Sequence, residues 1–110
     1  MSMSPAYAKT EPARADVDAL PGTTVLEFGA PWCGICAMAQ PAIAAALEHH
    51  PDVRHLKIED GPGRPLGRSF RVKLWPTLIF LRDGKEVERL VRPAGKGQIA
   101  DALARQVMRA

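Results

Sequence analysis

The feature that most constrains the fold is "VLEFGAPWCGICAMAQPAIAAAL", residues 25–47, which contains both cysteines of the chain, Cys33 and Cys36. The short apolar stretch over 23–28 is typical of a buried strand, and it leads directly to the first cysteine. The alanine-rich stretch that follows carries apolar residues one helical turn apart, which predicts a helix over 33–50. The chain is therefore expected to deliver a cysteine from the end of a strand to the start of a helix.

The remaining elements follow from periodicity and from turn residues. They are a helix over 10–20, a strand over 53–58, a short helix that contains Leu66 and Phe70, a strand over 77–81, a strand over 86–91 and a helix over 97–109. Asp83-Gly84 predicts a tight turn that joins the last two strands as a hairpin. Strands that alternate with helices and end in a hairpin predict an α/β domain, a central mixed sheet with helices on both faces.

Length and charge narrow the function. A chain of 110 residues makes one domain, which we place at 10–110, after a flexible lead-in over 1–9 with a short strand near Tyr7 as an option. The net charge of +3 comes with no basic run, so no nucleic-acid partner is expected. No stretch reaches the roughly 18 apolar residues of a membrane span, and the N-terminus lacks a secretory signal. We therefore expect a cytoplasmic protein, in which structural disulfides are disfavoured.

The cysteine pair has a metal-binding alternative. A closed zinc site needs four ligands, and the nearest other candidates are His49, His50 and His55. The first two lie at the far end of the same predicted helix, roughly 20 Å away at 1.5 Å per residue. No metal site is expected within one chain, and a site shared by two chains stays open.

The redox interpretation fits the local geometry better. At the start of a helix, Cys33 is expected to lie near unpaired backbone N–H groups and the positive end of the helix dipole, which favour a thiolate. Cys36, one turn further along, can reach back and attack a mixed disulfide formed at Cys33. A Cys-x-x-Cys pair beside a strand–helix pattern is the usual sequence sign of this chemistry.

The residues that surround the pair complete a resemblance. "VLEFGAPWCGICAMAQP", Trp75-Pro76-Thr77, Asp83-Gly84 and "KGQI" at 96–99 resemble the thioredoxin family, in the same order and at the same spacing, over about residues 23–107. The resemblance implies a thioredoxin-like fold and a thiol–disulfide oxidoreductase that uses a Cys33–Cys36 disulfide and no bound organic cofactor. It also implies disulfide-containing client proteins, and an NADPH-dependent thioredoxin reductase as the source of electrons.

The resemblance also assigns roles to residues. Cys33 would be the attacking thiol, Cys36 the resolving thiol, and Pro76 a cis-proline beside which an extended client strand docks; the alternative for Pro76 is an ordinary trans proline of an edge strand. The residues expected to contact clients are Trp32, Gly34, Ile35, Trp75, Pro76, Thr77 and Arg92.

Glu27 is the third expected catalytic residue. It stands where thioredoxins usually carry a buried aspartate, and a carboxylate in an apolar site can exchange a proton with the resolving cysteine. Taken without the resemblance, a glutamate in a strand is more often surface-facing or paired. His55 is either a partner of Glu27 or an ordinary strand histidine.

The chain departs from the family pattern at four positions. Ile35 replaces a proline between the cysteines, which restores an N–H and predicts a less reducing potential than a standard thioredoxin. Gly29 stands in place of a tryptophan and thins the pocket wall. Trp75 either narrows the client groove or covers the cysteines, and Arg92, in place of a glycine, would exclude some clients or the general reductase. Two functional alternatives remain, a docking module without catalysis and a reductase or isomerase dedicated to one client.

Overall fold

The protein folds as a mixed sheet with helices on both faces. The computed structural model of the chain describes residues 6–107. Its elements are α1 (Arg14–Asp18), β1 (Thr23–Gly29), α2 (Gly34–Glu48), β2 (Arg54–Glu59), α3 (Pro65–Ser69), β3 (Thr77–Arg82), β4 (Lys85–Val91) and α4 (Lys96–Val107). Within the described residues the strand order is β2-β1-β3-β4. β1 is parallel to β2 and antiparallel to β3, while β3 and β4 form the expected hairpin, so the predicted fold class is confirmed.

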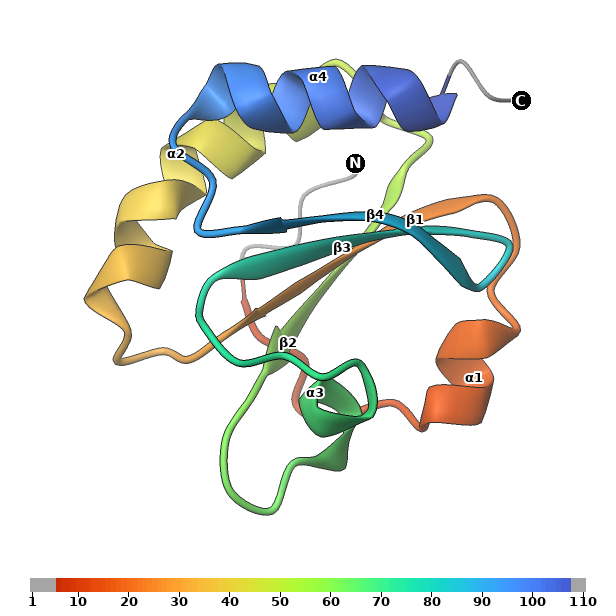
Figure 1. The fold of residues 1–110 in the computed structure, drawn as a ribbon, viewed down its shortest axis with the longest axis vertical. Coiled ribbons are helices and arrows are strands. Elements are labelled where there is room, and N and C mark those ends of the chain that lie inside the picture. Colours follow the sequence, from red (N-terminus) through yellow and green to blue (C-terminus); the bar gives the residue numbers. More distant parts are fainter. Residues whose placement is uncertain (1–5, 108–110) are drawn as a thin grey trace.

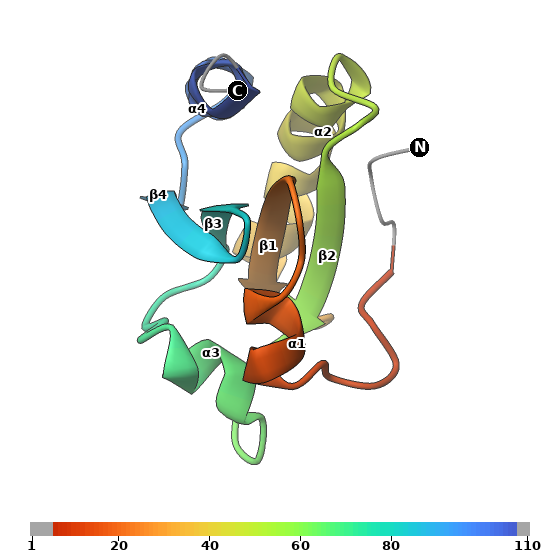
Figure 2. The ribbon, with the colours of Figure 1, turned by 90° about the vertical axis from the view of Figure 1, so that its right-hand side faces the viewer.

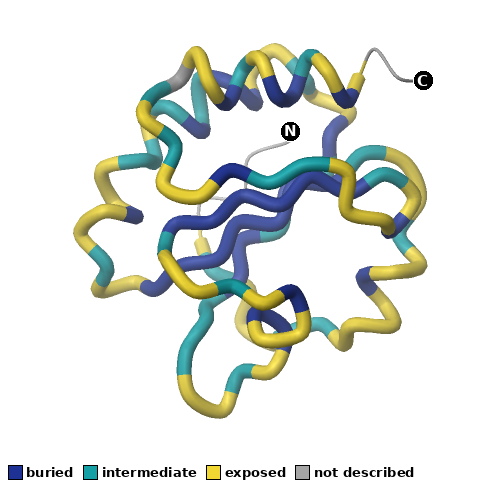
Figure 3. Tube along the Cα trace, in the orientation of Figure 1, coloured by how far each residue is buried: buried dark blue, intermediate teal, exposed yellow. Residues whose placement is uncertain are grey.

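The sheet separates two apolar clusters. Along β1, Val25 belongs to the cluster shared with α2 and α4, whereas Leu26 and Phe28 belong to the cluster shared with α1 and α3. Helices α2 and α4 accordingly cover one face of the sheet, and α1 and α3 lie against the other (Figures 1 and 2). The central strands are the most deeply buried part of the chain (Figure 3). This alternation places Glu27 on the same face as Val25, toward α2.

Helix α2 carries the cysteines at its first turn. Cys33 is its N-cap, and the helix ends at Glu48, two residues before the predicted end. The helix continues through Pro41, although a proline removes one backbone hydrogen bond, and its axis changes direction about midway (Figure 1). Ile43 and Leu47 are fully buried against the sheet, as their spacing predicts.

The helix expected over 10–20 is wrong in length, because α1 covers only Arg14–Asp18 and its N-cap is Ala13. The residue before a proline is disfavoured in helical geometry, so Pro12 keeps Glu11 out of the helix. The Glu11 side chain instead accepts a hydrogen bond from the Leu66 backbone N–H at 3.3 Å, which ties this segment to α3.

The expectations for the two chain ends fall partly outside the described residues. The lead-in predicted over 1–9 lies partly outside the described residues, and residues 6–9 form no strand near Tyr7. The Ala8 N–H nevertheless donates to the Lys57 carbonyl at 2.8 Å, which holds this segment beside β2. The last helix is described as far as Val107, and the rest of its predicted range, 108–109, lies outside the described residues. No helix within 6–107 is long and apolar enough to cross a membrane.

The β3–β4 turn is fixed by its two central residues. Asp83 has φ +49° and Gly84 has φ +80°, the pair of positive φ values that a two-residue hairpin turn requires. The Asp83 carboxylate accepts from the Gly22 backbone N–H at 2.7 Å, and this bond ties the turn to the start of β1. A Cβ at Gly84 would collide with the Asp18 backbone carbonyl, so α1 packs directly on the turn.

We expect Gly84→Ala to lower the free energy of unfolding by about 3 kcal/mol, from a left-handed backbone cost of about 1–2 kcal/mol plus an overpacking cost of similar size. Gly22→Ala is the matched control, because Gly22 has φ +74° and open space where a Cβ would lie. Urea denaturation of both variants measures the difference. Equal losses in the two variants would contradict the close packing of α1 on the turn.

Candidate active site

Cys33 lies at the junction between β1 and α2. It has extended backbone geometry as the N-cap of α2, and its Sγ accepts a hydrogen bond from the Cys36 backbone N–H at 3.2 Å. The side chain is half-buried, so a reagent can reach the sulfur. A backbone donor and the positive end of a helix both stabilise negative charge on this atom. Its thiolate character is a prediction that reactivity measurements can test.

Cys36 has the opposite environment. It is only 1% exposed, and both cysteines are free thiols. Burial raises the pKa of the Cys36 thiol to about 11, with a further contribution from its hydrogen bond with Cys33 and from the negative charge of Glu27. At neutral pH this thiol keeps its proton. The pair therefore consists of one accessible sulfur above one buried sulfur.

Glu27 is buried directly behind the cysteine pair. Its side chain is 0% exposed, and its Oε1 lies 2.9 Å from His55 Nε2. Gln40 Nε2 donates both to Glu27 Oε2 and to the Cys36 carbonyl, each at 2.8 Å, and so connects the carboxylate with the Cys36 backbone. A surface-facing Glu27 is excluded, and His55 is its partner.

Two members of this network were not expected from the sequence. Lys57 lies opposite Glu27 in the β1–β2 pairing, and its Nζ donates to Gln40 Oε1 at 3.0 Å. Strand alternation is the signal that could have found it, because Lys57 must share a face with His55, two residues before it. Gln40 lies one turn after Cys36, and nothing in the sequence distinguishes it from an ordinary helix residue.

Trp32, the residue before Cys33, packs against Trp75, and we call this pair of tryptophans the rim of the site. Trp32 is 75% exposed, and its ring meets Trp75 edge to face with the centroids 5.3 Å apart. Trp75 Nε1 donates to Asp60 Oδ2 at 2.9 Å, which fixes the second ring. The Trp75–Pro76 peptide bond is cis, as the resemblance implied.

Comparisons with known proteins agree with this geometry. The thioredoxin family profile matches residues 6–105. Thioredoxin 2 from Pseudomonas aeruginosa PAO1, solved in its reduced form, superposes with a TM-score of 0.87 at 51% identity, covering 98% of this chain and 100% of that one. The chain belongs to the thioredoxin family. It is a thiol–disulfide oxidoreductase, and the predictions of family, fold and activity are confirmed.

Other relatives of the thioredoxin family match over part of their length. The thioredoxin of Chlamydia trachomatis is 42% identical over 71 residues, which is 64% of this chain and 69% of the relative. Thioredoxin H2 from Arabidopsis thaliana is 36% identical over 67 residues, 61% of this chain and 50% of the relative, so the match spans half the length of that protein.

In this thioredoxin-family site, several expected client contacts come together. Ile35, Pro76 and Arg92 line one groove of about 280 Å³ beside the start of α2. Arg92 is fixed there, because its Nε donates to the Trp75 carbonyl at 2.8 Å and its backbone N–H donates to the Pro76 carbonyl at 2.9 Å. Ile35 is 46% exposed, so an apolar surface lies next to the reactive sulfur.

The two other expected contacts differ in position. Thr77 is 1% exposed, and its hydroxyl donates to the Leu74 carbonyl at 2.6 Å, so its side chain lies behind the groove and holds the turn before Pro76. Gly34 is exposed in the first turn of α2 with open space around it, so a client backbone can approach it closely.

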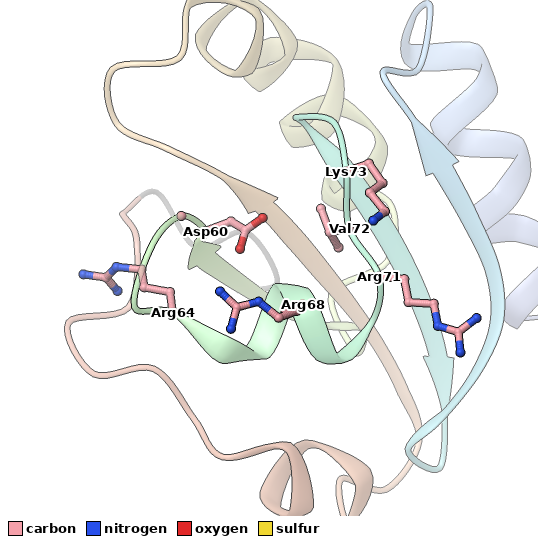
Figure 4. Close-up of a pocket in the computed structure, with 7 residues that line it drawn as sticks. Asp60, Arg64, Arg68, Arg71, Val72 and Lys73 are labelled. Carbon is pink, nitrogen blue, oxygen red and sulfur yellow. The ribbon is translucent and has the colours of Figure 1, made fainter.

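A second cavity lies beside α3 (Figure 4). Its volume is about 460 Å³, and it is lined by Asp60, Gly61, Arg64, Arg68, Arg71, Val72 and Lys73. Asp60 also holds Trp75, so this basic wall adjoins the rim of the cysteine site. Within residues 6–107, no three His, Cys, Asp or Glu side chains gather as a metal site.

The raised pKa of Cys36 predicts a pH dependence of stability. The folded thiol keeps its proton up to about pH 11, whereas an unfolded cysteine loses it near 8.5, so the folded form binds more protons between these values. The contribution of Cys36 to the unfolding free energy is therefore complete below about pH 8 and is lost as the pH rises toward 11. Urea denaturation of the reduced protein across this range measures the loss.

The matched controls are Cys36→Ala and the oxidised protein, both of which lack a thiol at this position. We expect the unfolding free energy of each to fall less steeply with pH than that of the reduced wild type. Parallel slopes in all three would contradict the raised pKa.

Proposed function

We propose that this protein reduces disulfide bonds in client proteins by dithiol–disulfide exchange at Cys33 and Cys36. The observation that carries the proposal is that one of the two sulfurs is accessible and the other is buried beneath it. Cys33 is accessible at the rim and hydrogen bonds with the Cys36 backbone, while the Cys36 thiol is buried beneath it and protonated at neutral pH. The first sulfur can meet a client, and the second is protected until it is needed.

The proposed cycle balances as two exchange steps. The Cys33 thiolate attacks one sulfur of the client disulfide, and the other client sulfur leaves with the electron pair and takes up a proton. The Cys36 thiolate then attacks Cys33 Sγ in the mixed disulfide, the bond between Cys33 and the client breaks, and the second client sulfur leaves. The client has gained two electrons and two protons, and the protein holds a Cys33–Cys36 disulfide.

Glu27 is the proposed acceptor of the Cys36 proton. Its carboxylate is buried on the α2 face of the sheet, is linked to the Cys36 backbone carbonyl through Gln40, and its negative charge acts on the Cys36 thiol. A carboxylate with so little solvent around it is a suitable base for a thiol, because both groups share one low-dielectric site. His55 and Lys57 hold the network in place from β2.

The groove beside the start of α2 is the proposed docking site for clients. Ile35, Pro76 and Arg92 line it, and the exposed Trp32 extends the surface. A client segment that lies extended beside Pro76 would bring its disulfide to Cys33. Arg92 adds a charge and a bulky side chain to this surface, which favours some clients over others.

Electrons are proposed to come from an NADPH-dependent thioredoxin reductase in the cytoplasm, which would return the Cys33–Cys36 disulfide to the dithiol. The redox-active disulfide serves in place of a bound organic cofactor. Family membership supports the reductase as partner, and the bulk of Arg92 on the docking surface bears on whether a general reductase fits. A reductase or isomerase dedicated to one client would use the same two sulfurs.

The principal test is insulin reduction with dithiothreitol as electron donor. We expect the wild type to precipitate the insulin B chain well above the background rate, and Cys36→Ser to fall to that background because the mixed disulfide at Cys33 is no longer resolved. Cys36→Ser should then retain clients as covalent adducts that dithiothreitol releases. A wild type that only matches the background rate would show that the chain is a docking module.

Ile35 is proposed to make the reduction potential of the Cys33–Cys36 pair less reducing than a proline at this position would. It occupies the first turn of α2 and supplies an N–H that a proline lacks. Donors near this turn stabilise the thiolate form, so Ile35→Pro should make the protein more reducing by about 30 mV, or about 1.4 kcal/mol between the redox states. Equilibration with glutathione, followed by quantification of free thiols, measures both potentials. A variant potential equal to or higher than the wild-type value would contradict this role.

A further inference from the structure

The space over Gly29 holds an unexpected contact. Gly29 ends β1 beside the cysteine pair, and a Cβ built there would lie 2.7 Å from Cys36 Sγ and 2.9 Å from the Tyr7 hydroxyl oxygen. Both values are below ordinary contact distances, so these two atoms occupy the position that a side chain at 29 would take. Tyr7 therefore closes the wall that Gly29 leaves thin, and it does so from a segment outside the sheet.

Two contacts with Lys57 hold Tyr7 in this position. The next residue, Ala8, donates its N–H to the Lys57 carbonyl at 2.8 Å, and Lys57 Nζ lies 4.6 Å from the centre of the Tyr7 ring. A cation over an aromatic face is attractive, and it fixes the plane of the ring. The Tyr7 hydroxyl oxygen and Cys36 Sγ then lie beside each other, because both are within 3 Å of the position that a Cβ at Gly29 would take.

We propose that the Tyr7 hydroxyl is a catalytic hydrogen-bond donor that stabilises the Cys36 thiolate during resolution of the mixed disulfide. The inference deepens the proposed function and rests on it. In that step Cys36 loses its proton to Glu27 and its thiolate attacks Cys33 Sγ, which breaks the bond to the client sulfur. The Tyr7 O–H keeps its own proton throughout and offsets part of the cost of a buried negative charge.

Tyr7 is suited to remain the donor. Burial raises the pKa of Tyr7 above its ordinary value, and the negative charges of Cys36, Glu27 and Cys33 add to this effect. The phenol therefore stays protonated in the pH range where Cys36 ionises. A hydrogen bond to a charged acceptor is stronger than one to a neutral acceptor, so the contact strengthens when the thiolate forms.

Stopped-flow reaction with 5,5′-dithiobis(2-nitrobenzoate) separates the two sulfurs. Attack by Cys33 releases the first thionitrobenzoate, and attack by Cys36 on the resulting mixed disulfide releases the second. We expect Tyr7→Phe to slow the second release about tenfold and to leave the first within about twofold of the wild type. Cys36→Ser, which lacks the second release, is the control for assigning the phases.

Tyr7→Leu separates the hydroxyl from the ring. If the hydroxyl stabilises the Cys36 thiolate, Tyr7→Phe and Tyr7→Leu slow the second release to the same extent. If Tyr7 only fills space, Tyr7→Phe behaves as the wild type and Tyr7→Leu alone is slow, which overturns the proposal. A wild type without a second release would overturn the resolving role of Cys36 itself, and the proposal with it, so the two failures are distinguishable.

The pH profile adds a readout that packing alone would not move. Cys33, Glu27 and Tyr7 are the groups that act on Cys36, and His55 and Lys57 stand behind Glu27. We expect the midpoint of the second release against pH to rise in Tyr7→Phe, because its thiolate has lost a donor. An unchanged midpoint would contradict the hydrogen bond.

A spectroscopic test uses the fact that Tyr7 is the single tyrosine of the chain. Biosynthetic incorporation of 3-fluorotyrosine places one fluorine beside Cys36 without a change in sequence. We expect the fluorine resonance to shift between the dithiol and disulfide forms of the protein. A resonance that stays the same in both forms would show that Tyr7 does not contact the reacting sulfur.

Discussion

The burial of the Cys36 thiol beneath Cys33 is the constraint on which the rest of the site depends. It follows from two local facts, a strand that ends at Gly29 and a helix that begins at Gly34, so that the first turn of α2 folds back over the end of β1. Removal of water raises the pKa of Cys36 to about 11, while the Cys33 sulfur accepts a backbone hydrogen bond at the rim. The two residues differ in burial and in their hydrogen bonds, and these differences suit Cys33 to the proposed attack and Cys36 to the proposed resolution.

Behind the cysteines the core contains a layer of polar side chains. Hydrogen bonds among them offset the free-energy cost of their burial. Glu27 lies in β1 between Leu26 and Phe28, which are both fully buried and apolar, and an unpaired carboxylate there would be strongly destabilising. His55, Gln40 and Lys57 supply its partners from β2 and α2. Buried polar groups that are fully hydrogen-bonded fix a single arrangement, so the carboxylate is held in one place relative to Cys36.

The wall of the site shows how a missing side chain can be replaced from a distance. Gly29 leaves a gap next to the Cys36 sulfur, and Tyr7 enters it from the segment that precedes α1. The result is a polar contact where a larger apolar residue at 29 would have given an apolar one. This substitution links the start of the chain to the chemistry of the second exchange step.

What the sequence determined by itself was local. The spacing of Cys33 and Cys36 within one helical turn and the tight turn at Asp83-Gly84 depend on neighbours in the chain, and these predictions agree with the structure. The tertiary structure decided which side chains meet across elements. Lys57 stands opposite Glu27 because of the β1–β2 register, and Tyr7 reaches Cys36 because Ala8 is tied to β2. Such contacts depend on how segments that are distant in the sequence pack together, and local residue patterns do not show this.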